Sequence, residues 1–230
     1  MRRLITAIVA LALLAGASSQ RSLPESREHF AALSSSVNRV AVIGDSYTAG
    51  GEFGGLGRKA WTARAWEALA RQRIPLTLDV GAEGGAGYGT RGENGSLFED
   101  LAARTVKADD VLVVFFGSRN DQGVHPAQLS ILVYGAFQLA RRMAPKASFL
   151  VIGPPWPTAD PPPAVLQIRD TLRYQAGVAG ATFVDPIAEG WFVGRPELIG
   201  ADGVHPTDAG HQYLADKIAP LIGARLPARL

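Results

Sequence analysis

Short apolar runs alternate with segments of helical periodicity along most of the chain. A short apolar run bounded by glycine or proline is typical of a buried strand, and longer segments with one apolar face are typical of helices. Strands are predicted at 40–43, 76–80, 111–116, 149–152 and 182–184, and helices at 59–71, 96–103, 129–143, 165–178 and 207–221. This alternation predicts an α/β fold, in which helices cover both faces of a parallel sheet.

Two of these helices carry capping signals at their starts. Ser96 is followed three positions later by Glu99, which resembles a capping box. Thr207 is the expected N-cap of the last helix.

The N-terminal residues have the pattern of a secretory signal. Arg2 and Arg3 precede an apolar run from Leu4 to Leu14, and Ala15 to Ala17 are small residues of the kind that signal peptidase recognises. The run is shorter than the ~20 residues of a membrane-spanning helix. Cleavage is expected after Ala17, which would make the protein secreted or a protein of the cell envelope; an uncleaved segment would act as an anchor. The expected organisation is a signal peptide over 1–17, a polar leader over 18–37 and one domain over 38–230.

Composition narrows the possible partners. The chain has 23 Lys and Arg against 21 Asp and Glu. Because Arg2 and Arg3 belong to the signal, the remaining domain is balanced in charge. No basic stripe with interleaved aromatic residues is present, so no nucleic-acid partner is expected. The chain contains 0 Cys, which excludes disulfides and thiolate chemistry. No spacing of metal-ligand residues suggests a metal, and no cofactor is expected.

Unusual polar residues cluster where the predicted strands end. Function collects at the carboxyl ends of parallel strands, because the connecting loops meet there. Four such segments stand out: Gly44–Gly50, Gly81–Gly87, Gly117–Asp121 and Asp202–Pro206.

These segments contain the groups that acyl transfer needs. The Ser46 hydroxyl is a weak nucleophile that requires a neighbouring base, and the imidazole of His205 can take its proton. Asp202 can orient that imidazole from three positions away. Each also has a plainer interpretation: Ser46 as a helix N-cap, and Asp202 with His205 as a turn before the last helix.

Together the segments resemble the GDSL, or SGNH, family of serine esterases and acylhydrolases. Gly44-Asp45-Ser46 is similar to the first block of that family and Gly85 to the second. Asn120-Asp121 is similar to the third and Asp202-Gly203-Val204-His205-Pro206 to the fifth. The blocks occur in the family's order and span residues 44–206.

The resemblance implies a flavodoxin-like three-layer sandwich whose five parallel strands have the order 2-1-3-4-5. It implies Ser46 as nucleophile, His205 as base and Asp202 as the orienting carboxylate. The implied oxyanion hole consists of the N–H groups of Ser46 and Gly85 and the side-chain amide of Asn120. Gly84 remains an alternative to Gly85, because this block is richer in glycine than is usual.

One departure lies in the third block. The family usually has glycine two positions before the asparagine, where this chain has Ser118, with Arg119 between Ser118 and Asn120. The chain also lacks the Gly-x-Ser-x-Gly elbow of ordinary α/β-hydrolases, as expected for this family.

The expected function is hydrolysis of carboxylic esters, on a small molecule, a glycan or a lipid. Short acyl groups are favoured because no long apolar lid is visible. Tyr47 and Trp156 are candidate substrate contacts, and the loop 52–57 either shapes the cleft or only connects elements. Two alternatives stay open. The same acyl-enzyme could transfer its acyl group to a sugar hydroxyl, or the chain could be a non-catalytic carbohydrate-binding module.

Three further features are interpreted conservatively. Gly87, Gly89 and Gly92 fit Gly-x-Gly-x-x-Gly, but no helix is predicted to begin there, so a dinucleotide site is not expected. His211 is expected on a helix face, and His125 either lines the pocket or is exposed. Trp191 and Phe192 follow the fifth strand and could be packing residues.

Overall fold

A computed structural model of the protein describes residues 37–117 and 119–227. The predictions for the signal peptide, for leader residues up to 36 and for Ser118 lie outside the described residues. Five parallel strands form one sheet in the order β2-β1-β3-β4-β5, which confirms the predicted order. The strands are β1 (Asn38–Gly44), β2 (Leu76–Ala82), β3 (Asp110–Phe116), β4 (Ser148–Ile152) and β5 (Thr182–Val184).

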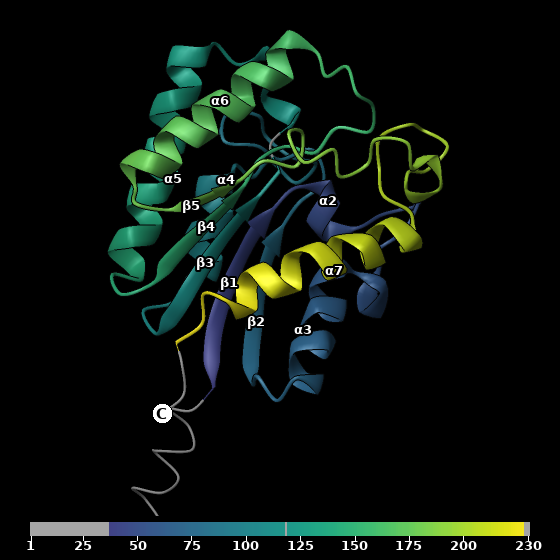
Figure 1. The fold of residues 1–230 in the computed structure, drawn as a ribbon. Helices are drawn as coiled ribbons and strands as arrows, with labels where there is room; N and C mark the ends of the chain where they lie inside the picture. The colour runs from purple at the N-terminus through teal and green to yellow at the C-terminus, as the bar shows by residue number, and fades with distance from the viewer. Residues whose placement is uncertain (1–36, 118, 228–230) are drawn as a thin grey trace, which may run out of the picture. The chain divides into compact units, whose positions relative to one another are not determined.

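Helices cover both faces of the sheet (Figure 1). The helices α3 and α7 pack together on one face, and α4, α5 and α6 cover the other. The short α2 follows β1 at the carboxyl edge of the sheet. The α-helices are α2 (Ser46–Ala49), α3 (Trp61–Arg71), α4 (Phe98–Thr105), α5 (Pro126–Met143), α6 (Pro163–Val178) and α7 (Asp208–Gly223), and the 3₁₀-helices are η1 (Gly57–Lys59), η2 (Arg119–Gly123) and η3 (Pro196–Leu198).

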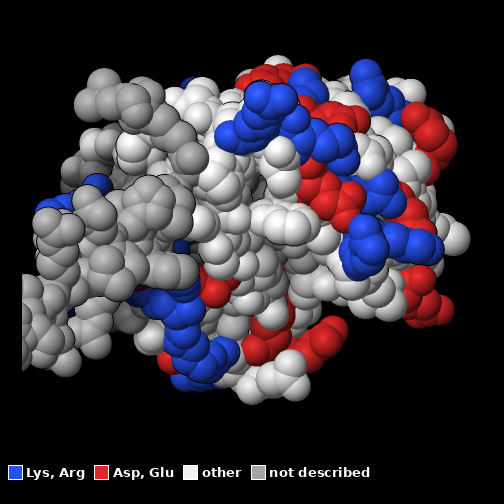
Figure 2. Space-filling model, turned by 90° about the horizontal axis from the view of Figure 1, so that it is seen from below, with Lys and Arg blue, Asp and Glu red and all other residues white. Residues whose placement is uncertain are grey.

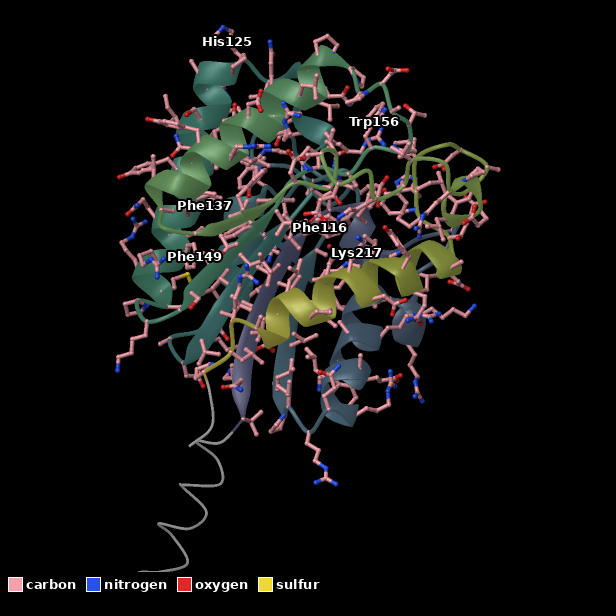
Figure 3. The ribbon with its side chains drawn as sticks, in the orientation of Figure 1. Phe116, His125, Phe137, Phe149, Trp156 and Lys217 are labelled. Atoms are coloured by element: carbon pink, nitrogen blue, oxygen red, sulfur yellow. The ribbon has the colours of Figure 1, made fainter. Side chains whose placement is uncertain are left out.

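The core has two layers because successive side chains of a strand point to opposite faces. In β1, Val40 and Val42 pack beneath α3 and α7, whereas Ala41 and Ile43 face the other helices. In the second layer Phe137 of α5 lies close to Phe149 of β4, as Figure 3 shows. The continuous apolar runs in the sequence therefore supply both layers.

One predicted cap is confirmed and one is wrong. The Thr207 hydroxyl accepts a hydrogen bond from the N–H of Gly210 at 3.1 Å. Helix α4 instead has Leu97 as its N-cap residue, and the Leu97 N–H donates to the Asp100 carboxylate at 3.0 Å. The hydroxyl of Ser96 does not cap the helix; it accepts from Arg104 at 2.8 Å. Asp100 therefore supplies the carboxylate at this helix start, whereas the sequence pattern predicts Glu99.

Charged residues are interspersed on the face seen from below, where positive and negative side chains alternate (Figure 2). Some ion pairs link neighbouring strands and the segments next to them. Arg39 of β1 pairs with Asp79 of β2, and Lys107 approaches the same carboxylate at 3.1 Å. Within residues 37–117 and 119–227, no helix has both the length and the apolar character needed to span a bilayer.

Candidate active site

Ser46 is the first residue of α2, directly after the end of β1. The Asp45 carboxylate accepts a hydrogen bond from the N–H of Tyr47 at 2.9 Å and so acts as the N-cap. The cap position belongs to Asp45, which leaves the Ser46 hydroxyl available for another role. At Gly44 a Cβ atom would lie 2.2 Å from the Thr48 hydroxyl oxygen, so this tight strand-to-helix turn requires glycine.

A hydrogen-bonded series joins Ser46, His205 and Asp202. The Nε2 atom of His205 lies 3.1 Å from the Ser46 Oγ, and its Nδ1 lies 2.5 Å from the Asp202 Oδ2. The other oxygen of Asp202 accepts from the N–H groups of Val204 and His205 at 3.0 and 3.1 Å. Asp202 thus stabilises the turn and also orients the imidazole. The interpretation of Asp202 and His205 as a turn before the last helix is therefore compatible with their interpretation as a carboxylate and a base.

The environment of Asp202 favours its charged form. Partial desolvation opposes ionisation, but the hydrogen bond from Val204 and those from His205 outweigh it and lower the pKa of Asp202 below its ordinary value. A carboxylate bonded to Nδ1–H leaves Nε2 as the acceptor that faces Ser46. This arrangement can remove the proton from the serine hydroxyl.

Gly85 and Asn120 are held next to each other at the adjoining strand ends. The Asn120 side-chain amide donates to the Ala86 carbonyl at 2.8 Å, and its second N–H remains for another acceptor. Gly85 has φ +74°, in the left-handed region that favours glycine. A side chain at Gly84 would instead meet the Glu93 carboxylate at 2.7 Å.

Asp121 fastens this glycine-rich loop to the end of β3. Its buried carboxylate accepts hydrogen bonds from the N–H groups of Tyr88, Gly89 and Thr90 at 2.8–2.9 Å. A Cβ at Gly87 would lie 2.5 Å from the same carboxylate. Gly87 and Gly89 therefore serve this contact, and the next helix begins only at Phe98. The sequence displays Asp121 beside Asn120, but nothing in its pattern reveals this anchoring.

Tyr47 and Trp156 occupy different environments. The Tyr47 ring is fully buried and its hydroxyl donates to the Val204 carbonyl at 2.5 Å, so the ring has no exposed surface for a substrate. Burial raises the pKa of Tyr47 above its ordinary value, with Arg119 acting in the opposite direction. Trp156 follows β4, is partly exposed and lies above the carboxyl edge in Figure 3.

A glycine-rich hairpin, Gly50–Gly55, stands beside the base. Gly51 and Gly54 pair through reciprocal backbone hydrogen bonds at 2.9 and 3.2 Å, which places Phe53 near the tip. The Phe53 ring stacks on the His205 imidazole, with centroids 6.1 Å apart and an interplanar angle of 2°. This segment of the loop 52–57 therefore supplies an apolar wall next to the base, which favours a role in shaping the cleft over that of a simple connector.

The hairpin is clamped to the start of α7. The Gly55 N–H donates to Asp208 at 3.1 Å, and Lys59 pairs with the same carboxylate at 2.6 Å. Gly55 also lies against the buried ring of His211, since a Cβ there would come within 2.1 Å of its Nε2. His211 is thus a packing residue on a helix face.

The remaining candidates lie outside the site. His125 is exposed and caps α5 by accepting from the Ala127 N–H at 3.3 Å, and Figure 3 shows it far from Phe116. Trp191 and Phe192 are each 1% exposed and are packing residues. Among the described residues, no group of three potential ligands could hold a metal ion.

A serine hydroxyl, an imidazole and a carboxylate in hydrogen-bonded series at the carboxyl edge of a parallel α/β sheet define a serine hydrolase. The chain belongs to the GDSL-like lipase/acylhydrolase family, whose model matches residues 42–213. It is therefore a lipase/esterase that acts on ester bonds, as the four sequence blocks predict.

Known proteins support this assignment. GDSL lipase Rv0518 of Mycobacterium tuberculosis (strain ATCC 25618 / H37Rv) is 64% identical over 193 residues, which cover 83% of this chain and 84% of that protein. The crystal structure of TesA shares 23% identity and a TM-score of 0.64, over 82% of this chain and all (100%) of that one. The esterase EstA from Pseudoalteromonas sp., inhibited by monoethylphosphonate, shares 13% identity and a TM-score of 0.63, over 81% of this chain and 97% of that one. The two structures share the fold.

Proposed function

We propose that the protein hydrolyses carboxylic esters through an acyl-Ser46 intermediate. The Ser46 Oγ attacks the ester carbonyl carbon while Nε2 of His205 takes the hydroxyl proton. The carbonyl oxygen becomes an oxyanion, which the N–H groups of Ser46 and Gly85 and the Asn120 amide stabilise. The bond to the alcohol oxygen then breaks, and His205 returns the proton to the departing alcohol.

Water completes the cycle. His205 removes a proton from a water molecule, whose oxygen attacks the acyl carbon of acyl-Ser46. The bond to Oγ breaks, the carboxylic acid leaves and the proton passes back to Ser46. Asp202 keeps the imidazole oriented and stabilises its protonated form throughout.

The observation that carries this proposal is the 3.1 Å contact between Nε2 of His205 and Oγ of Ser46. A fluorophosphonate probe tests it directly, because the Oγ–P bond forms as the P–F bond breaks and His205 takes the proton. We expect the added mass on the peptide containing Ser46 and loss of labelling in His205→Ala. Labelling at another residue would refute the assignment.

Substitution provides the kinetic test. We expect Ser46→Ala to lower kcat on p-nitrophenyl acetate by at least about 10³-fold while the fold persists. Ser148→Ala is the matched control, because Ser148 is an exposed serine at the opposite end of a strand and its loss should leave kcat unchanged. Full activity in Ser46→Ala would contradict the mechanism.

We further propose short acyl groups, carried on glycans or lipids, as the natural class of ester. A p-nitrophenyl series from acetate to palmitate measures this preference, which we expect to peak at the short end. Adding sugar acceptors and analysing the products separates hydrolysis from acyl transfer. Acylated sugar as the main product would favour the transferase.

We also propose that the protein is exported, either secreted or retained at the cell envelope. The support is the basic pair Arg2-Arg3, the apolar run from Leu4 to Leu14 and the small residues up to Ala17. Mass spectrometry of the protein from a secreting host should give a mature chain that begins at Ser18. An intact N-terminus in the membrane fraction would indicate a retained anchor.

A further inference from the structure

Arg119 has an unusual guanidinium, which no acceptor neutralises. It begins η2 at the carboxyl end of β3 and is partly buried. Its guanidinium contacts the neutral Tyr47 hydroxyl, but across residues 37–117 and 119–227 its Nη1 is enclosed without a hydrogen-bond partner. The other partly buried arginines all have acceptors; they are Arg39, Arg64, Arg141, Arg169 and Arg225. A desolvated charge without a counter-charge costs free energy. A bound anionic ligand would offset this cost at Arg119.

Aromatic groups support this guanidinium without neutralising it. Its central carbon lies 4.4 Å from the centroid of the Trp156 ring, a stacking contact that favours arginine. The Trp156 indole N–H donates to the Thr158 hydroxyl at 3.1 Å, which fixes the ring. Arg119 also lies close enough to Tyr47 to affect the ionisation of that phenol.

The nearby carboxylates are already committed. Asp45 caps α2, and Asp202 holds the imidazole of His205 and two backbone N–H groups. Since Asn120 follows Arg119 directly in the chain, this guanidinium lies one residue from a group assigned to the oxyanion hole.

We propose that Arg119, backed by Trp156, binds an anionic group of the ester substrate, a carboxylate or a phosphate. The inference rests on the proposed esterase function and adds a substrate class to it. A planar guanidinium can donate two parallel hydrogen bonds to either anion. A bound anion would provide the negative charge that no described carboxylate places beside Arg119. A neutral ester would leave the positive charge of the guanidinium without a counter-charge.

Matched ester pairs test this selectivity. The carboxylate pair is mono-4-nitrophenyl glutarate and 4-nitrophenyl hexanoate; the phosphate pair is acetylglycerol phosphate and acetylglycerol. We expect the wild type to favour the anionic member of one pair by about tenfold or more in kcat/KM. The pair that shows the preference identifies the anion.

The decisive quantity is the ratio of kcat/KM within each variant. In Arg119→Gln we expect the ratio to fall to about one. Arg141→Gln is the matched control, because the central guanidinium carbon of Arg141 also lies over an aromatic ring, 4.0 Å from the centroid of Phe149. Arg141 belongs to α5, outside the site, and donates a hydrogen bond to the Ala147 carbonyl. It should keep the wild-type ratio. Equal rates within both pairs for the wild type, or an unchanged ratio in Arg119→Gln, would overturn the proposal.

Binding to Ser46→Ala separates this inference from the catalytic one. Calorimetry should show mono-4-nitrophenyl glutarate or acetylglycerol phosphate binding about tenfold more tightly than its neutral partner, and the added Arg119→Gln change should abolish the difference. Equal affinities would refute the anion site even if esterase activity is established. Hydrolysis by Ser46→Ala would refute the proposed mechanism and leave the wild-type ratio as the test of Arg119.

Discussion

At the scale of single residues, Tyr47 connects the nucleophile to the base. It follows Ser46 in the chain, and its buried hydroxyl donates to the Val204 carbonyl, next to His205. We expect Tyr47→Phe to lower kcat by about fivefold and the free energy of unfolding by about 1–2 kcal/mol, the value of one buried hydrogen bond. Steady-state kinetics on p-nitrophenyl acetate and urea unfolding measure the two effects. A loss of stability with unchanged kcat would show that the hydroxyl serves the fold alone.

The sequence predicts some of these residues better than others. Ser46, Asp202 and His205 are predictable as a group because their side-chain chemistry and their places after strands agree, and the structure brings all three together. Tyr47 is a candidate substrate contact by sequence, whereas its ring is buried in the structure. Its burial depends on Phe116 and Phe192, which pack against its ring and which lie far away in the chain.

At the scale of elements, the hairpin Gly50–Gly55 depends on close backbone contact with α7. Gly55 has φ +79° and would place a Cβ against His211, whereas Gly57 has φ +58° and nothing within 4 Å. Alanine at either position carries backbone strain, but only Gly55→Ala adds a collision. We expect Gly55→Ala to reduce the free energy of unfolding by about 2 kcal/mol more than Gly57→Ala does. Urea unfolding measures both, and equal losses would show that the hairpin can move away from α7.

The same hairpin shows where prediction from sequence stops. Periodicity predicts the strands and long helices because each repeats one simple burial pattern. The segment 50–55 has no such pattern, and its shape follows from contacts with Asp208 and His211. The start of α4 differs for a related reason: Glu83 accepts from the N–H of Ser96 at 3.1 Å, so tertiary structure decides which residue caps the helix.

At the scale of the whole molecule, His211 makes stability depend on pH. Burial lowers its pKa to about 4, with Asp208 partly opposing this effect. As the pH falls from about 6.5 towards 4, the unfolded chain takes up a proton that the folded protein refuses, so stability is lost across this window. We expect His211 to account for about 3 kcal/mol of that loss.

Two variants isolate this contribution. His211→Asn keeps an acceptor for the backbone N–H of Trp61, which donates to the imidazole Nδ1 at 3.3 Å in the wild type. This variant should reduce the fall in unfolding free energy between pH 7 and about pH 4. His125→Asn is the control, since His125 is exposed and asparagine is a good N-cap. It should follow the wild-type curve. An unchanged slope in His211→Asn would mean that other groups cause the loss.

The order of the sheet came from the family resemblance, while its parallel character came from the alternation of elements. The alternation alone fits several orders, because it does not specify which strands become neighbours. The four sequence blocks mark the loops after β1, β2, β3 and β5, and any parallel order places these loops at the same edge of the sheet. The order β2-β1-β3-β4-β5 is therefore predictable only through the resemblance that the blocks carry.

Ser46 and His205 are separated by 159 positions in the chain. A chain leaving the ribosome exposes its nucleophile long before its base has been synthesised, and it cannot catalyse hydrolysis until that base is present. The two halves of the proton transfer meet only after the segment following β5 has docked. Hydrolysis can therefore begin only after folding has brought these two distant segments together.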